Sequence, residues 1–89
     1  MRNAIIGFCD WLTVEKGYSP HTVTSYRRDL LEFAALVGED SGVDALTRGA
    51  IRSFVIGLHG RNSSATVGRK LSSLRTFCRF LLRRSMIEK

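Results

Sequence analysis

The stretch from residue 19 to residue 37 reads SPHTVTSYRRDLLEFAALV and carries the clearest helix-start signal in this sequence. Ser19 is a favourable N-cap, and Pro20 suits the first helical position because no backbone amide donor is needed there. Apolar residues then recur every three or four positions and form one stripe: Val23, Tyr26, Leu30, Phe33 and Val37. Because this is the period of an amphipathic helix, the sequence predicts a helix over residues 20–37.

Three further segments show the same helical period, and we expect helices over residues 3–16, 48–59 and 64–84. In the last of these, the apolar stripe is Val67, Leu71, Leu74, Cys78 and Leu81, with Leu82 alongside. Gly17 suits a left-handed C-cap, and Thr47 suits an N-cap. The last helix is expected to start near Ser63 or Ser64. No segment alternates polar and apolar residues for long enough to predict a strand. The expected fold is therefore all-α, a compact four-helix bundle.

The size of the chain and its apolar runs exclude several classes of protein. Its 89 residues are enough for one domain, residues 1–89, with one hydrophobic core. The apolar runs are too short to cross a membrane and the N-terminus does not resemble a signal peptide, so we expect a cytoplasmic protein. Cys9 and Cys78 lack a second cysteine or a histidine at ligand spacing. We therefore expect two buried thiols, no metal and no cofactor.

Positive charge is concentrated in the last third of the chain. Residues 1–60 hold six Lys/Arg and seven Asp/Glu, whereas residues 61–89 hold eight Lys/Arg and one Glu, within a net charge of +6. A localised basic stripe is typical of a nucleic-acid-binding surface. A membrane-surface role for the same helix is less favoured, because its apolar stripe is needed for the core.

The sequence contains no pattern that predicts catalysis. His21 and His59 have no acidic cluster beside them, and neither a Gly-rich phosphate loop nor a GxSxG nucleophile elbow is present. Tyr18 and Tyr26 are better explained as packing residues than as nucleophiles. We therefore expect the chain alone to have no enzymatic activity.

DNA contact is better supported, at the starts of two helices. A helix N-terminus offers free amides to a phosphate, and an arginine one turn in can reach the edge of a guanine. In the last helix we expect Arg69, Lys70 and Ser73 to be exposed, with Arg69 reading bases, while Arg79 and Arg83 contact phosphates. The full set of expected DNA-contacting residues is His21, Thr22, Thr24, Ser25, Arg28, Thr66, Arg69, Lys70, Ser73, Thr76, Arg79 and Arg83.

Phe80 departs from this pattern, since the helical period places it on the polar side of the last helix beside Thr76 and Arg83. Two interpretations stay open. Phe80 packs against a following domain or a neighbouring protomer, or it is a partly covered surface aromatic.

Several motifs together resemble the N-terminal core-binding domain of Xer-type tyrosine recombinases, the phage-integrase class. They are FCDWL at 8–12, KGYSPHTV at 16–23, YRRDL at 26–30, SATV at 64–67 and RKLSSLR at 69–75. The resemblance implies a SAM-like four-helix domain that forms half of a C-shaped clamp around a recombination half-site. Its partners would be double-stranded DNA and other recombinase protomers, and the fragment alone would be monomeric.

The resemblance also assigns residues. By position, His21, Thr22, Thr24 and Ser25 match the family's second-helix contacts, and Thr66, Arg69 and Ser73 match its fourth-helix contacts. In that family the catalytic arginines, histidines and nucleophilic tyrosine belong to a C-terminal domain, which we expect to be absent from this chain.

Two other functions remain open from the residues alone. A helix-turn-helix transcriptional regulator would need a tight turn before a recognition helix of ordinary length, and would bind a palindromic operator as a dimer. A SAM-like protein-interaction module is the other alternative, which the basic C-terminal third disfavours unless the partner is acidic.

Overall fold

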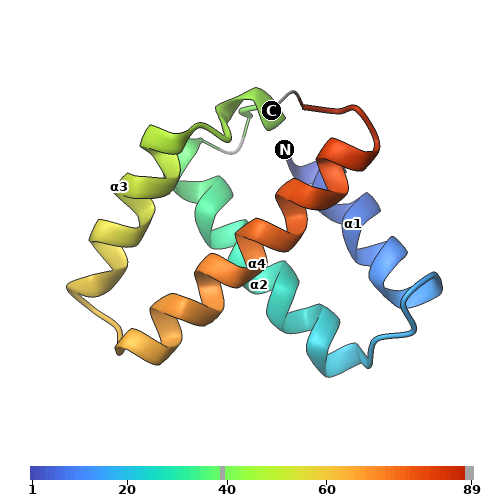
Figure 1. Ribbon diagram of the computed structural model, residues 1–89, viewed down its shortest axis with the longest axis horizontal. Helices are drawn as coiled ribbons and strands as arrows, with labels where there is room; N and C mark the ends of the chain where they lie inside the picture. Colours follow the sequence, from blue (N-terminus) through green and yellow to red (C-terminus); the bar gives the residue numbers. More distant parts are fainter. Residues whose placement is uncertain (39, 88–89) are drawn as a thin grey trace.

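The computed structural model describes residues 1–38 and 40–87, so residues 39, 88 and 89 of the expected 1–89 domain lie outside the described residues. These described residues form four α-helices and one short 3₁₀ helix, whose arrangement is shown in Figure 1. Their bounds are α1 Arg2–Val14, α2 Pro20–Val37, η1 Val43–Ala45, α3 Arg48–His59 and α4 Ser64–Arg83. The described residues contain no strand, and the all-α class is confirmed.

The helix starts are fixed by side-chain caps. The hydroxyl oxygens of Ser19, Thr47 and Ser63 accept hydrogen bonds from the backbone amides three residues later, at 3.3, 3.1 and 3.2 Å. Each bond satisfies one of the amides that a helix N-terminus leaves without an intrahelical partner. α2, α3 and α4 therefore begin at residues 20, 48 and 64, where the sequence predicts them.

α1 ends at Val14 rather than at the expected residue 16. The chain turns through Gly17, whose φ of 65° is the left-handed conformation that a glycine adopts without steric cost. The amide of Tyr18 then donates to the carbonyl of Leu12 at 3.0 Å and closes the turn. α4 likewise ends one residue before the expected residue 84, and η1 was not expected from the sequence.

α4 crosses α2 near the middle of the molecule, with α1 on one side of the crossing and α3 on the other (Figure 1). The side chains that meet between the helices form one hydrophobic core. Its largest fully buried members are Phe8, Phe33, Phe77, Ile5, Leu12, Leu30, Leu58, Leu74 and Leu81. The crossing leaves the N-terminal halves of α2 and α4 splayed apart on one side of the molecule, and α1 beside the C-terminal half of α4 (Figure 1).

α4 buries a different stripe from the one predicted. Val67, Leu74 and Leu81 face the core as expected, but Leu71 and Cys78 are only half-buried and Leu82 is 39% exposed. The buried face is completed by Lys70, Ser73, Phe77 and Phe80. Both stripes step by three and four residues, and the one that occurs contains a lysine and a serine because a carboxylate on α2 faces them.

The prediction that Phe80 lies on the polar side of α4 is wrong. Phe80 is 5% exposed, and its ring centroid lies 5.2 Å from those of both Phe8 and Trp11 on α1. The guanidinium carbon of Arg84 lies over the ring of Phe80, 4.8 Å from its centroid. Phe80 therefore joins α4 to α1 within this chain and is not available to pack against another domain or protomer.

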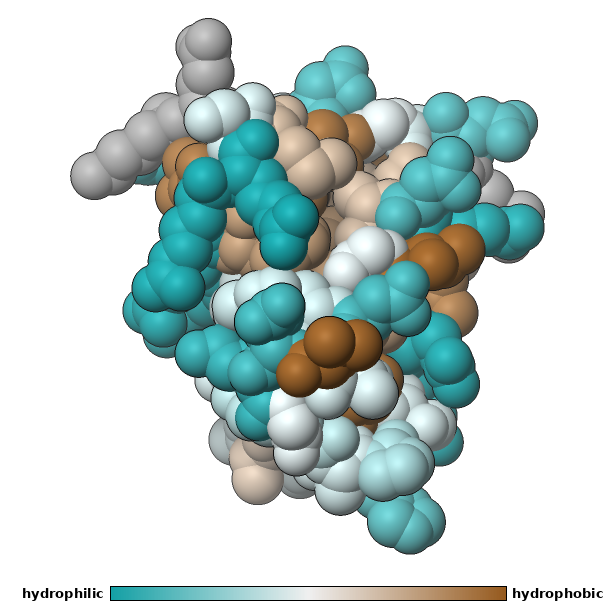
Figure 2. All heavy atoms as spheres, turned by 90° about the vertical axis from the view of Figure 1, so that its right-hand side faces the viewer, coloured by the Kyte–Doolittle hydropathy of each residue, from teal (hydrophilic) through white to brown (hydrophobic). Residues whose placement is uncertain are grey.

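The surface on the α1 side carries hydrophobic residues only as separate patches among hydrophilic ones (Figure 2). Within residues 1–38 and 40–87, no helix is both long enough and apolar enough to cross a membrane. The same residues contain no group of three or more histidine, cysteine or acidic side chains that could hold a metal ion.

Candidate nucleic-acid interface

Two of the hollows that lie beside α4 together contain most of the predicted DNA-contacting residues. The first, which we call the N-terminal hollow, has a volume of about 240 Å³. It is lined by Thr22, Ser25, Tyr26, Asp29, Arg69, Ser72 and Ser73. Residues 22–29 of α2 and residues 69–73 of α4 therefore line the same hollow.

The second hollow, the C-terminal hollow, also has a volume of about 240 Å³. Its lining is Trp11, Leu12, Lys16, Tyr18, Tyr26, Thr76, Arg79, Phe80 and Arg83. Tyr26 of α2 borders both hollows, and their linings on α4 follow one another along the helix, at residues 69–73 and 76–83. The two hollows therefore adjoin. Together they form what we call the α2–α4 face.

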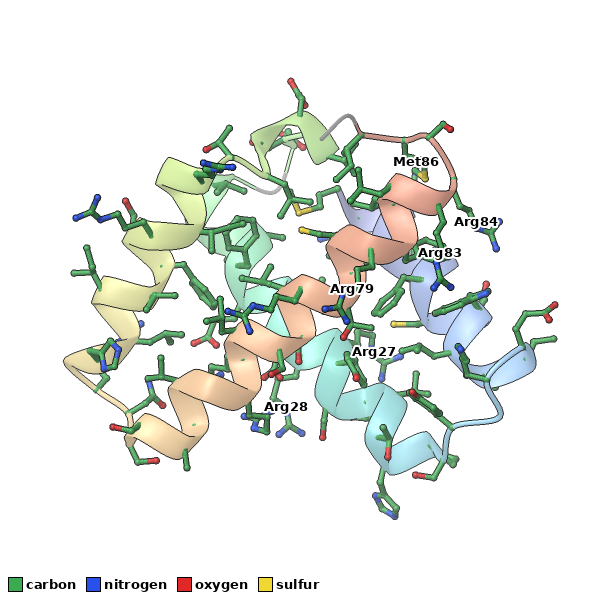
Figure 3. All side chains as sticks on the ribbon, in the orientation of Figure 1. Arg27, Arg28, Arg79, Arg83, Arg84 and Met86 are labelled. Carbon is green, nitrogen blue, oxygen red and sulfur yellow. The ribbon has the colours of Figure 1, made fainter. Side chains whose placement is uncertain are left out.

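Arg79 and Arg83 project from the C-terminal half of α4, and Figure 3 shows them near each other on the side of α1. Within the described ranges, neither forms a hydrogen bond or an ion pair with an acidic residue. Lys16 lies over the ring of Trp11, with its Nζ 5.3 Å from the centroid. Three cations without a carboxylate partner in this part of the structure therefore surround the C-terminal hollow.

The other predicted residues lie less centrally. His21 is exposed at the start of α2, and Thr24 is half-buried. Thr66 lies in the cap of α4, where its hydroxyl accepts a hydrogen bond from Ser63 at 3.1 Å. Arg28 is exposed but lines neither hollow, and Figure 3 shows it apart from Arg79 and Arg83.

The expectation that Lys70 and Ser73 are exposed is wrong. They are 8% and 5% exposed, because both point from α4 toward Asp29 on α2. Ser73 Oγ donates to Asp29 Oδ2 at 2.8 Å, and Lys70 Nζ lies 3.5 Å from Oδ1. Lys70 also forms a hydrogen-bonded ion pair with Glu32. A helical wheel that treats every polar residue as solvent-facing cannot show this arrangement.

Arg69 belongs to the same cluster but keeps access to solvent. Its Nη1 donates to Asp29 Oδ2 at 2.7 Å, while half of its side-chain surface remains exposed in the N-terminal hollow. Asp29 itself is 1% exposed. Two cations, Arg69 and Lys70, thus face two carboxylates, Asp29 and Glu32, and this part of the face carries no net charge.

Asp29 is the site residue that sequence reasoning missed. Its signal is positional: it lies three residues after Tyr26 and four before Phe33, within the apolar stripe of α2. Lys70 and Ser73 hold the equivalent inward positions on α4, three residues after Val67 and one before Leu74. A carboxylate inside one stripe and donors inside another predict a buried polar link, because buried charges need partners.

The chain matches a known protein family over most of its length. Residues 5–85 match the family model described as phage integrase, N-terminal SAM-like domain. No solved structure gives a significant match.

Several proteins named tyrosine recombinase XerC are similar to the chain. Over 80 residues it is 42% identical to the one from Alcanivorax borkumensis, covering 89% of this chain and 26% of that protein. It is 39% identical to the one from Listeria innocua and 35% identical to the one from Anoxybacillus flavithermus, each over 83 residues, 90% of this chain and 28% of the relative. The chain thus spans about a quarter of the length of these relatives. Since the family model covers nearly all of it, the chain belongs to the phage integrase N-terminal SAM-like domain family.

Proposed function

We propose that this chain is the DNA-binding N-terminal domain of a site-specific tyrosine recombinase, and that its α2–α4 face grips a recombination half-site. The observation that carries the proposal is the meeting of the two hollows along α4. Hydroxyls and an arginine lie at one end, and three cations without carboxylate partners among the described residues lie at the other. Polar groups that can face base edges therefore adjoin cations that can face phosphates.

The two ends of the face would make different contacts. α4 has 20 residues and is about 30 Å long, which is enough to lie along a groove of duplex DNA. Arg79, Arg83 and Lys16 would neutralise phosphates, because no carboxylate in the described part of the chain competes for them. Thr22 and Arg69 would face the bases or the sugar–phosphate backbone from the N-terminal hollow.

The parent protein, in this proposal, is a tyrosine recombinase like the relatives it resembles. DNA strand exchange would depend on a tyrosine nucleophile outside these 89 residues, and the role of this domain would be to hold double-stranded DNA beside other protomers. The domain would act without a cofactor, because its contacts are hydrogen bonds and ion pairs.

The proposal is tested by titrating the chain into a fluorescein-labelled duplex and following anisotropy at several salt concentrations. Three phosphate contacts predict a slope of about −2.7 for log K against log salt, so that binding is roughly 40-fold weaker at 200 mM than at 50 mM salt. Absence of binding at 50 mM salt would contradict the proposal and favour the protein-interaction module. Tight binding of a palindromic duplex by a stable dimer would instead favour the helix-turn-helix regulator.

A further inference from the structure

The cluster around Asp29 gives Arg69 a role different from that of the other arginines on the α2–α4 face. We propose that Asp29 is a positioning residue, which fixes the Arg69 guanidinium at the N-terminal hollow so that Arg69 reads a base edge rather than neutralising a phosphate. This inference rests on the proposed function and deepens it, because it divides the face into a part that selects sequence and a part that supplies affinity.

Asp29 is almost completely buried. A carboxylate that is 1% exposed has lost its water and needs charged or polar donors to offset that loss. α4 supplies them, with hydrogen bonds to Oδ2 from Arg69 at 2.7 Å and Ser73 at 2.8 Å, and with Lys70 at 3.5 Å from Oδ1. Two hydrogen bonds hold Oδ2, while buried Oδ1 accepts no hydrogen bond within the described ranges and faces the Lys70 ammonium. The carboxylate therefore provides a fixed point for Arg69.

The guanidinium of Arg69 is bound to Asp29 through one nitrogen. Arginine carries five N–H donors in a rigid plane, and Arg69 uses Nη1 for Asp29. Within residues 1–38 and 40–87 no other hydrogen bond from this guanidinium is found, and half of its side chain is exposed. Donors therefore remain for a bidentate contact with O6 and N7 of a guanine, and the Asp29 bond limits the rotamers that would have to be frozen on binding.

The balance of charge differs between the N-terminal hollow and the C-terminal hollow. Arg69 and Lys70 are balanced by Asp29 and Glu32, so releasing counterions from a phosphate at this site gains little. Around the C-terminal hollow, by contrast, Arg79 and Arg83 have no carboxylate partner among the described residues. A neutral site with directed donors suits base recognition, and an unbalanced one suits phosphate binding.

The experiment selects preferred sequences from a pool of randomised duplexes with the wild-type chain and then measures discrimination. Discrimination is the ratio of Kd for a scrambled duplex to Kd for the selected one. Asp29→Asn keeps the size of the side chain and an acceptor for Ser73 but removes the charge that holds Arg69. We expect this variant to lose about tenfold in discrimination while binding the scrambled duplex at least as well as wild type. Glu32→Gln is the matched control, since it removes the same charge from the cluster but leaves the Arg69–Asp29 bond intact. We expect the added positive charge to strengthen binding to both duplexes equally, so that discrimination is unchanged.

A double-mutant cycle separates positioning from a merely structural role. Arg69→Lys keeps the charge but loses the planar guanidinium and its paired N–H donors. This variant should therefore lose about tenfold in discrimination with an unchanged salt slope. If Asp29 acts through Arg69, Asp29→Asn should have no further effect on discrimination in the Arg69→Lys background. If the double variant instead lost the product of the two single losses in discrimination, the proposal would be overturned. Full discrimination in either single variant would also overturn it.

The remaining outcomes are also decisive. If circular dichroism shows that Asp29→Asn is unfolded, Arg69→Lys carries the test, and discrimination retained by that variant overturns the proposal. A wild-type chain that binds duplexes without sequence preference overturns the inference but leaves the proposed function standing. A wild-type chain that binds no duplex overturns both.

Discussion

Phe80 of α4 and Trp11 of α1 lie with their ring centroids 5.2 Å apart, and both line the C-terminal hollow beside Arg79 and Arg83. The aromatic contact fixes the C-terminal half of α4 against α1, and so fixes the backbone from which the two arginines project. The core of this small domain and its candidate interface thus share side chains.

Replacing Phe80 should therefore cost stability. We expect Phe80→Ala to lower the free energy of unfolding by about 3–5 kcal/mol, because the buried ring leaves a cavity next to Phe8 and Trp11. Leu82→Ala, two residues along the same helix at a position 39% exposed, should cost less than about 1 kcal/mol. Urea denaturation followed by circular dichroism measures both values, and equal losses would show that Phe80 is not the core residue described above.

The arginines of the C-terminal hollow should carry salt-dependent affinity. Arg79→Ala and Arg83→Ala should each weaken binding to duplex DNA and make the slope of log K against log salt shallower by about 0.9, the value for one phosphate contact. Arg52→Ala is the matched control, because Arg52 is also exposed but lies on α3 and lines neither hollow. Anisotropy titrations between 50 and 200 mM salt measure these slopes. An equal change of slope in Arg52→Ala would show that positive charge affects DNA binding wherever it lies on the surface, which would contradict a local phosphate contact.

A comparison of two neighbouring serines should show how much the N-cap of α4 contributes to the free energy of unfolding. Ser63 Oγ accepts the amide hydrogen of Thr66 at 3.2 Å, whereas Ser64 is the first residue of the helix and is exposed. We expect Ser63→Ala to lower the free energy of unfolding by about 1 kcal/mol and Ser64→Ala to change it by less than about 0.5 kcal/mol. Thermal unfolding of the two variants tests this, and a larger loss in Ser64→Ala would contradict the assigned cap.

Two glycines in the N-terminal third should respond to alanine with opposite signs. At Gly17 the φ of 65° disfavours any residue with a Cβ, so Gly17→Ala should destabilise the fold by about 1–2 kcal/mol. At Gly7, inside α1, an added Cβ meets nothing within 4 Å, so Gly7→Ala should stabilise it by about 0.5–1 kcal/mol. Chemical denaturation gives both numbers, and the same sign for both would be inconsistent with the turn at Gly17.

The two thiols should react slowly in the folded chain. Burial raises the pKa of Cys78, and burial raises the pKa of Cys9 more than Arg27 lowers it. Both thiols are therefore less ionised at pH 8 than a free cysteine. The protonated thiol is the form that the folded state favours, so this contribution to stability is full below pH 9 and is lost as the pH rises further.

Reaction with a disulfide reagent measures this, with Cys9→Ala and Cys78→Ala variants to assign the two phases. Half-buried Cys78 should react before buried Cys9, and unfolding in urea should make both fast. Rates at pH 8 equal to those of free cysteine in the folded chain would contradict the burial described here.

The sequence predicted helix starts well because they are local. Ser19, Thr47 and Ser63 meet partners only three residues away, and such hydrogen bonds can be inferred without knowing the fold. The end of α1 was missed by two residues because the turn at Gly17 is closed by bonds that reach back into the helix.

The inward face of α4 could not be predicted in the same way, because it depends on residues about 40 positions away. Lys70 and Ser73 are buried only because Asp29 meets them from α2. The same tertiary partner changes Arg69 from a freely solvated cation into a held one. Local pattern thus predicted the helices that carry the candidate interface, whereas the charge and orientation of its side chains follow from the crossing of α2 and α4.

Binding of duplex DNA by the α2–α4 face can be tested directly by recording amide NMR spectra of the ¹⁵N-labelled chain while duplex DNA is added at low salt. We expect the shifted amides to concentrate in residues 20–28 of α2 and 64–83 of α4, with α3 residues such as Arg52 little affected. Shifts that avoid α2 and α4, or spectra that do not change with any duplex, would contradict the claim that this face binds DNA.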